Sequence, residues 1–295
     1  METPAHFWHP FEKRISTFDE LVAVINNITQ RSISNNLQFA WRGHVNSNWS
    51  LHSSLYRRSI IGKSPINEMD FQKIEKSILI ELHRWGLHSP PSHGRLSILN
   101  QLAMLQHYGS PTRLIDITFN AWVGVWFAVE EKWNNGELVN DDVDGRLFAI
   151  DITKRIINEN DTFRKWEDSL SRPWKPSNLD SRIFAQNGGF LFGGVPSTAR
   201  PHGSPLQFPK STNNSDGYWP INDVRRATSV AIRPHSYSAT SGRVSDNALY
   251  TFVIDSSIKR YIRDFLKRSF GYQHSTIYPD YTGFASFGTP KIKSH

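Results

Sequence analysis

Arg113-Leu-Ile-Asp-Ile-Thr-Phe-Asn-Ala-Trp-Val-Gly-Val-Trp-Phe-Ala-Val129 is the stretch of sequence that decides the fold. Its first part, residues 113–118, is predicted to form a short buried strand, because it is largely apolar and follows a Gly-Ser-Pro turn. Asn120 can cap a helix over 121–133 that is apolar on nearly every side, which indicates a helix at the centre of the domain. The apolar run of this helix is too short to span a membrane.

Further helices and strands are predicted on both sides of this stretch. A capping box at Thr17 begins the first helix. Apolar spacing predicts helices over 17–30, 71–85 and 96–107, and another that ends near Phe270. Alternating or apolar runs predict strands at 37–41, 145–151 and 249–255, with a strand-like stretch within 184–192. We therefore expect an α+β fold in which N-terminal helices lie on a mixed or antiparallel sheet.

The chain is predicted to form one domain with short additions at its ends. We expect an N-terminal helical segment over 1–34, the domain itself over 35–285 and a C-terminal tail over 286–295. Residues from about 193–220 are rich in Gly, Pro, Ser and Asn. A stretch of this kind inside a domain is typical of a lid, a binding loop or a partly disordered segment.

The composition limits the chemistry that the chain can perform. Its 295 residues include no cysteine, which excludes disulfides, thiolate metal sites and cysteine nucleophiles, and favours a cytoplasmic location. The N-terminus lacks the basic and apolar regions of a secretory signal. The net charge of +7 favours polyanionic partners, nucleic acid above all, although such a charge also serves solubility.

Basic residues gather on the predicted helix near the C-terminus. The candidate nucleic-acid surface consists of Lys259, Arg260, Arg263 and Lys267. The alternative is a solvated helix face whose cations interact favourably with the dipole at the helix C-terminus.

The sequence lacks the short motifs of several common enzyme classes. Its twelve histidines show no His-x-x-x-His or His-Glu-x-x-His spacing, so no helix-borne zinc site is predicted. A Gly-x-Ser-x-Gly elbow, a Walker loop and a Gly-x-Gly-x-x-Gly dinucleotide fingerprint are also absent from the sequence.

Three stretches of the sequence resemble the signature of the FRG domain, a family named for a Phe-Arg-Gly motif. They are residues 106–120, Trp126-Phe-Ala128 and Trp41-Arg42-Gly43. The resemblance extends over about residues 35–285. Trp41 replaces the Phe of the motif, and Ala121 stands where many relatives have Pro. The family is found in bacterial and phage proteins and implies no defined activity, so function has to be argued from the site.

A second resemblance is to the core of ADP-ribosyltransferases. Those enzymes have, in this order, a strand that ends in aromatic-Arg-Gly, a strand that bears Ser or Thr, and a helix that ends in Phe-Ala. In this chain the corresponding pieces are Arg42, Asp116-Ile-Thr118 and Trp126-Phe-Ala128. This resemblance implies an ADP-ribosyltransferase-like core, NAD as the consumed substrate and modification of a nucleic acid. An enzyme of this kind would act as a toxin or a phage-defence effector.

The resemblance also implies roles for individual residues. Transferases of this kind place a Glu on a later strand, where this chain has Gln186, so Asp116 and Asp280 are alternative acids and His107 a candidate acid or base. The candidate NAD-binding residues are Arg42, Gly43, Tyr108, Thr112, Arg113, Thr118, Arg182 and Phe190.

Each of these residues also has a structural interpretation. Arg42 can form an ion pair, Gly43 can permit a close backbone approach, and His107 can stabilise a helix C-terminus. Asp116 is expected to be buried, where it either pairs with an arginine or belongs to the site.

Two alternative functions remain open from the sequence. One is a non-catalytic module that binds nucleic acid or a nucleotide, and the other is a metal-dependent nuclease that uses Asp116 and His107. The transferase and the non-catalytic binding module would use the same cleft. The residues predicted to converge on it are Arg42, Thr112, Arg113 and Gln186.

Overall fold

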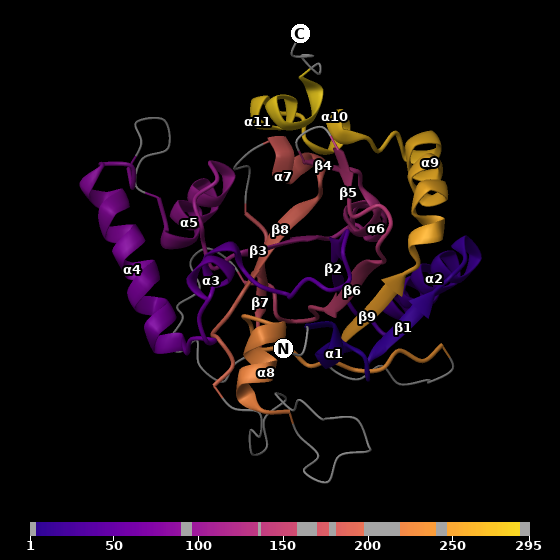
Figure 1. Cartoon of the computed structure of the whole chain (residues 1–295), viewed down its shortest axis with the longest axis horizontal. Helices are drawn as coiled ribbons and strands as arrows, with labels where there is room; N and C mark the ends of the chain where they lie inside the picture. Colours follow the sequence, from indigo (N-terminus) through magenta and orange to yellow (C-terminus); the bar gives the residue numbers. More distant parts are fainter. Residues whose placement is uncertain are drawn as a thin grey trace.

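The computed structural model describes residues 4–89, 96–134, 137–157, 170–176, 181–197, 219–239 and 247–289. Its centre is a seven-stranded sheet in the order β1-β9-β6-β2-β3-β8-β7 (Figure 1). These strands are β1 (Glu12–Ile15), β2 (Phe39–His44), β3 (Ile115–Thr118), β6 (Gly145–Asp151), β7 (Arg172–Trp174), β8 (Gly188–Phe192) and β9 (Leu249–Ile254). Only β1 and β9 pair in parallel, so the fold is a mixed α/β domain with a mostly antiparallel sheet.

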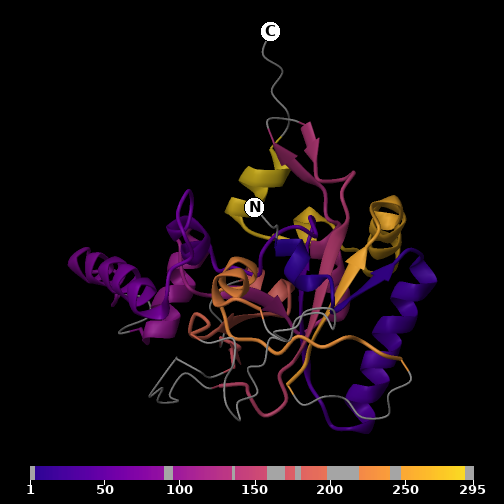
Figure 2. The same cartoon turned by 60° about the horizontal axis from the view of Figure 1, so that its bottom comes forward.

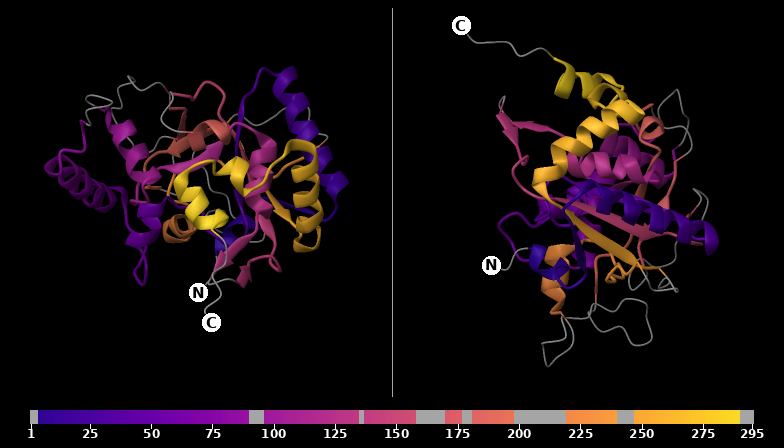
Figure 3. Two further views of the ribbon diagram at one scale, coloured as in Figure 1. Left: turned by 90° about the horizontal axis from the view of Figure 1, so that it is seen from above. Right: turned by 90° about the vertical axis from the view of Figure 1, so that its right-hand side faces the viewer.

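Three helices cover one face of the sheet: α2 (Phe18–Ser34), α6 (Ala121–Val129) and α9 (Lys259–Phe270). The capping box predicted at Thr17 begins α2. Both panels of Figure 3 show α2 beside α9, and the ring of Phe18 lies 4.6 Å from that of Phe265. The helix predicted to be central, α6, lies directly on β2 and β6, with its N-terminus capped by Asn120.

The approach of α6 to the sheet depends on glycine. A Cβ atom built on Gly43 would lie 2.2 Å from the carbonyl oxygen of Gly124 in α6, and one built on Gly145 would lie 2.2 Å from that of Ala128. No side chain fits at such a distance, so these glycines allow two backbones to meet. The structure thus gives Gly43 the close-approach role that the sequence indicated as its structural interpretation.

The opposite face is covered by α1 (Pro4–Trp8) and α8 (Ile221–Ala227). Strand β2 contributes to both layers, since Phe39 and Trp41 face α6 whereas Ala40 faces the second core. Beyond β8, the helices α3 (Ser54–Ser59), α4 (Glu68–Arg84) and α5 (Ile98–His107) form a flank from which α4 projects (Figure 2). The remaining elements are β4 (Lys132–Asn134), β5 (Glu137–Val139), α7 (Ser181–Ala185), η1 (Ser256–Ile258), α10 (His274–Ile277), α11 (Tyr281–Gly283) and η2 (Phe284–Gly288).

The predicted end of the central helix is wrong. The central helix ends at Val129, because Glu130 leaves the helical conformation and residues 132–134 form the strand β4. The strand-like stretch predicted within 184–192 is confirmed as β8, which begins at Gly188 after the short helix α7. Most of the predicted loop at 193–220, namely residues 198–218, lies outside the described residues.

None of the helices among the described residues combines the length and the hydropathy that a membrane-spanning helix requires.

Candidate functional site

A cleft of about 310 Å³ opens between β2, β3 and β8 of the sheet and the helical segments beside them. Arg42 and Gly43 come from β2, Asp116 and Thr118 from β3, and Phe190 from β8. His107 lies at the end of α5, and Arg182 and Gln186 lie in and just after α7. The cleft therefore brings together most of the site residues predicted from the sequence, but not all of them.

Arg42 is fixed on the rigid strand β2. Its Nη1 donates a hydrogen bond to the backbone oxygen of Asp116 (2.5 Å), and its Nε donates to Nε2 of His44 (3.0 Å). Because Nε2 accepts this bond, His44 is neutral. Burial lowers the pKa of Arg42, although the nearby Asp116 opposes that shift. The guanidinium stays charged and lines the cleft.

Asp116 is not buried, contrary to the sequence prediction. Its side chain is 63% exposed and points into the cleft, with Oδ2 3.7 Å from Nη1 of Arg42. Nε2 of Gln106 donates to its Oδ1 (2.6 Å). The strand prediction itself was correct, but the alternation along β3 places this one carboxylate on the open side. Asp116 is thus accessible to a ligand.

Arg182 and Asp280 form a bidentate ion pair at the rim of the cleft, with two N–O distances of 2.6 Å. Burial alone raises the pKa of Asp280, but the hydrogen bonds from Arg182 and from the Gly283 amide lower it overall. Asp280 is therefore an ionised partner of Arg182 and a poor proton acceptor.

Gln186 is held by the backbone, since its Nε2 donates to the backbone oxygen of Ile277 (3.0 Å).

Phe190 and Thr118 define the floor of the cleft. The Phe190 ring is 5% exposed and stacks on Trp174 at 5.8 Å. The hydroxyl of Thr118 donates to the backbone oxygen of Gln186 (2.7 Å) and accepts from the amide of Asn120. Thr118 thereby connects β3 with both the cap of α6 and the residue that follows α7.

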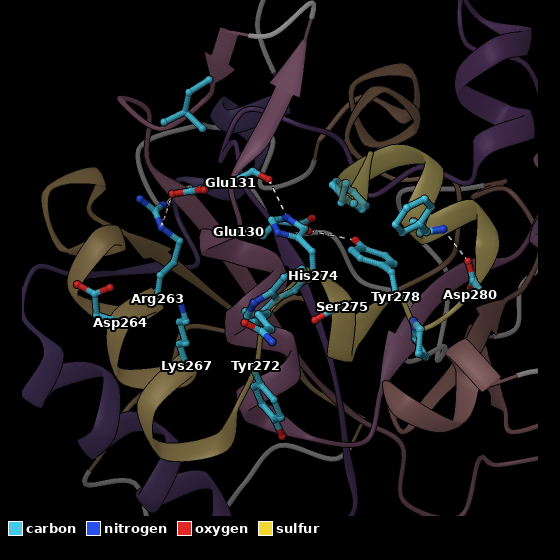
Figure 4. A pocket seen from close by; sticks show the side chains of 18 of the residues that line it. Glu130, Glu131, Arg263, Asp264, Lys267, Tyr272, His274, Ser275, Tyr278 and Asp280 are labelled. Atoms are coloured by element: carbon cyan, nitrogen blue, oxygen red, sulfur yellow. Dashed lines mark hydrogen bonds and ion pairs between the residues drawn. The ribbon is translucent and has the colours of Figure 1, made fainter. Parts of the chain in front are cut away.

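A buried acid that the sequence reasoning missed lies at one wall of the cleft. Glu130 is 3% exposed; its Oε1 lies 2.5 Å from Nζ of Lys132, and its Oε2 accepts a hydrogen bond from the hydroxyl of Tyr278 (3.0 Å; Figure 4). Burial raises the pKa of Glu130, while Lys132 opposes the shift. The sequence feature that could have identified Glu130 is its position directly after the apolar helix, because a charged side chain there must find a partner or water.

A second missed residue is Arg57 in α3. It is exposed, lines the cleft, and its charge lowers the pKa of Arg42, His44 and His52. Two guanidinium groups that line one cleft and repel each other favour the binding of an anion there. Nothing in the local sequence indicated that this arginine would line the same cleft as Arg42.

Three predicted site residues lie outside the cleft. Arg113 is 2% exposed and binds Glu75 (2.6 Å) and Glu68 (3.1 Å), which joins α4 to β3. Thr112 is fully buried and donates to Gln106, and Tyr108 is 75% exposed beside α5. The predicted convergence is therefore correct for Arg42 and Gln186 and wrong for Thr112 and Arg113.

Two of the four residues of the predicted basic surface on α9 are bound by partners within the protein. Lys259 is 1% exposed, and its Nζ donates to the backbone oxygens of Val45 and Asn140, both at 2.7 Å. Burial lowers the pKa of Lys259 to about 8. Arg263 binds Asp141 at 2.5 Å. Only Arg260 and Lys267 of the predicted set are exposed.

No metal site is evident within the described ranges. Among those residues, no group of three or more His, Asp or Glu side chains is placed to hold a metal ion. The carboxylates of Glu130 and Asp280 are instead bound by cations of the protein.

His52, at the edge of the cleft, is expected to make stability depend on pH. Burial lowers its pKa from 6.5 to about 4. Since the unfolded chain binds this proton at a higher pH, stability falls as pH drops from 6.5 to 4, by about 3 kcal/mol for this residue. Urea unfolding of the wild type and His52→Gln at pH 7 and pH 4.5 measures the difference. Parallel losses of stability in the two proteins would contradict the assignment.

Comparison with known proteins gave one match. The family model of the FRG domain matches residues 37–137. Comparisons with curated proteins and with solved structures found no match. The matched segment supplies Arg42, Asp116 and Glu130, whereas Gln186 and Tyr278 come from later parts of the chain that complete the same cleft.

Proposed function

The chain contains an FRG domain, and we propose that the cleft of this domain binds NAD and transfers ADP-ribose from it, releasing nicotinamide. The observation that carries the proposal is that two cations, a buried carboxylate and two carboxamides line one cleft of about 310 Å³. These groups are Arg42 and Arg57, Glu130, and Gln106 and Gln186.

The residues of the cleft fit such a substrate. Arg42 and Arg57 supply two guanidinium groups for phosphate oxygens, which such groups bind through paired hydrogen bonds. Phe190 supplies an aromatic surface for a planar ring. The volume of about 310 Å³ is at the lower end of the range of small-molecule sites, roughly 300–1,000 Å³, so we place the nicotinamide ribose in the cleft and the remainder of NAD toward its opening.

The proposed reaction needs little acid catalysis. The bond between the ribose carbon and the nicotinamide nitrogen breaks, and its electron pair leaves with neutral nicotinamide. A nucleophilic oxygen or nitrogen of the acceptor then bonds to that carbon and releases a proton. Glu130 stabilises the positive charge that develops on the ribose and accepts the proton, because a carboxylate in a buried position interacts strongly with charge.

Tyr278 and Lys132 would position Glu130. The Tyr278 hydroxyl and the Lys132 ammonium each hold one oxygen of the carboxylate, so its orientation is set before substrate binds. Glu130 would thereby replace the later-strand Glu that ADP-ribosyltransferases have and this chain lacks at Gln186.

We propose a nucleic acid as the acceptor and a toxin or phage-defence effector as the biological role. The net charge of +7 supports a polyanionic partner. The exposed cations Arg260 and Lys267 on α9 support it further, although Lys259 and Arg263 do not contribute.

The two neighbouring arginines of α3 provide a matched test. Arg57 lines the cleft, whereas Arg58 is exposed outside it. We expect Arg57→Ala to raise KM for NAD roughly tenfold, the effect of losing one charge-assisted hydrogen bond, and Arg58→Ala to leave KM unchanged. Nicotinamide release, measured by chromatography with DNA, RNA and protein as acceptors, gives both values.

Two results would contradict parts of the proposal. If NAD stays intact with all three acceptors and still binds, the transferase proposal is wrong and the cleft belongs to a non-catalytic nucleotide-binding module. Equal effects of the two arginine variants would contradict the placement of phosphate at Arg57.

A further inference from the structure

A second cavity, which we call the groove, adjoins the cleft. It has a volume of about 1340 Å³ and lies between the end of α6 and the segments α9, α10, α11 and η2 (Figure 4). Glu130 and Tyr278 line both the groove and the cleft. A molecule in the groove therefore lies against the acid that we propose for catalysis and against the tyrosine that positions it.

Aromatic side chains stand open to solvent in the groove. Tyr281 is 95% exposed and Phe284 is 60% exposed. Deeper in the groove, the ring of Phe287 stacks on that of Tyr278 at 4.8 Å, with an angle of 21° between the rings. Exposed rings beside an ordered stack provide flat surfaces that bases of a single strand can extend.

Most charges of the groove are already neutralised within the protein. Asp141 and Glu131 lie 2.5 and 3.7 Å from nitrogens of Arg263. Two further acids of the groove, Glu130 and Asp280, are bound by Lys132 and Arg182, which lie outside its lining. Because the single Arg263 offsets only one of Asp141 and Glu131, the acids and cations of the groove balance as a whole. Along α9 itself, Arg260 and Lys267 outnumber Asp264, so these two cations are the ones that a phosphate can reach.

We infer that the groove binds a single-stranded nucleic acid, with bases on Tyr281 and Phe284 and phosphates near Arg260 and Lys267, and presents it to the cleft as the acceptor of ADP-ribose. This inference rests on the proposed function for the transfer step alone, since strand binding needs no NAD. Bases of a duplex are stacked on one another and offer no free face, so the single-stranded form is favoured.

Size favours a polymer over the adenine half of NAD. The groove exceeds the range of about 300–1,000 Å³ that is typical of small-molecule sites. Its polar wall runs along α9, where Arg260 and Lys267 lie seven residues apart on one helix face. An extended backbone can contact both.

Fluorescence anisotropy with labelled twelve-nucleotide DNA and RNA strands, in the absence of NAD, tests the inference. We expect strands to bind more tightly than the matched duplex. The Tyr281→Ala and Phe284→Ala variants should each weaken binding roughly tenfold, and Lys267→Ala several-fold, with a reduced salt dependence. Trp85→Ala and Lys76→Ala change an exposed ring and an exposed lysine of α4, outside the groove, and should leave binding unchanged.

Four outcomes overturn the inference. Strands that do not bind, or that bind Tyr281→Ala and Phe284→Ala as tightly as the wild type, place the nucleic acid elsewhere. A higher KM for NAD in these variants with unchanged strand binding assigns the groove to adenine, and transfer to protein without strand binding assigns it to a protein acceptor. Strand binding without nicotinamide release supports the groove and contradicts only the proposed reaction.

Discussion

We expect Glu130→Gln to lower kcat for nicotinamide release by about 10²–10³, with little change in KM for NAD. The substitution keeps the shape and the hydrogen bond with Tyr278 but removes the negative charge. That charge is needed mainly when the ribose becomes positive, so the effect falls on the chemical step and not on binding. The readout is nicotinamide release at saturating and at limiting NAD.

The neighbouring acid is the control for this variant. Glu131 is 41% exposed and lies 3.7 Å from Arg263, so Glu131→Gln should retain wild-type turnover. Thermal unfolding of both variants shows whether a loss of turnover is a loss of fold. Turnover of a folded Glu130→Gln variant within threefold of the wild type would remove Glu130 from the reaction.

A tyrosine variant separates positioning from catalysis. Tyr278→Phe removes the hydroxyl that donates to Glu130, and with it one group that stabilises the ionised carboxylate. We expect the acidic limb of the pH profile of kcat/KM to move to higher pH. A role of Tyr278 in packing alone would lower stability and leave that limb in place.

Local patterns predicted the elements that form the core. Thr17 and Asn120 each carry a side chain that caps the next few amides, so the starts of α2 and α6 could be predicted from the sequence. The apolar surface all around α6 indicated that other elements must cover it on several sides, and the sheet and α9 do so. These predictions depend on residues within about one helical turn of one another.

The direction of charged side chains could not be predicted in the same way. Arg113 follows a glycine turn, a pattern that also suits phosphate binding, yet its partners Glu68 and Glu75 lie on a helix far earlier in the chain. Lys259 begins a helix that looks basic in sequence, but carbonyls of Val45 and Asn140 hold it inside. Long-range partners of this kind depend on topology, which local spacing does not contain.

The same limit explains why the site was only partly predicted. Arg42 and Gln186 belong to stretches that resemble known families, and both line the cleft. Glu130 and Arg57 belong to stretches without a recognisable functional pattern, and they reach the cleft because α6 ends and α3 turns there. The pair of cations and the buried acid therefore became visible only in three dimensions.

The glycine of the Trp41-Arg42-Gly43 motif gives the largest expected effect on stability. We expect Gly43→Ala to lower the free energy of unfolding by about 3 kcal/mol or more, since the new Cβ would lie 2.2 Å from Gly124 O and 2.4 Å from Ala128 N. Both are backbone atoms of the central helix and cannot rotate away. Urea unfolding followed by circular dichroism measures the loss.

A glycine with a different constraint makes the comparison specific. Gly109 has a φ of +84° and open space around it, so Gly109→Ala should cost only the conformational penalty, about 1–2 kcal/mol. If Gly43→Ala instead unfolds like the wild type and loses NAD binding, its backbone serves the ligand, as the transferase resemblance implied. Loss of stability in Gly43→Ala beyond that in Gly109→Ala would mean that this glycine positions Arg42 indirectly, by letting α6 lie directly on the strand that carries the arginine.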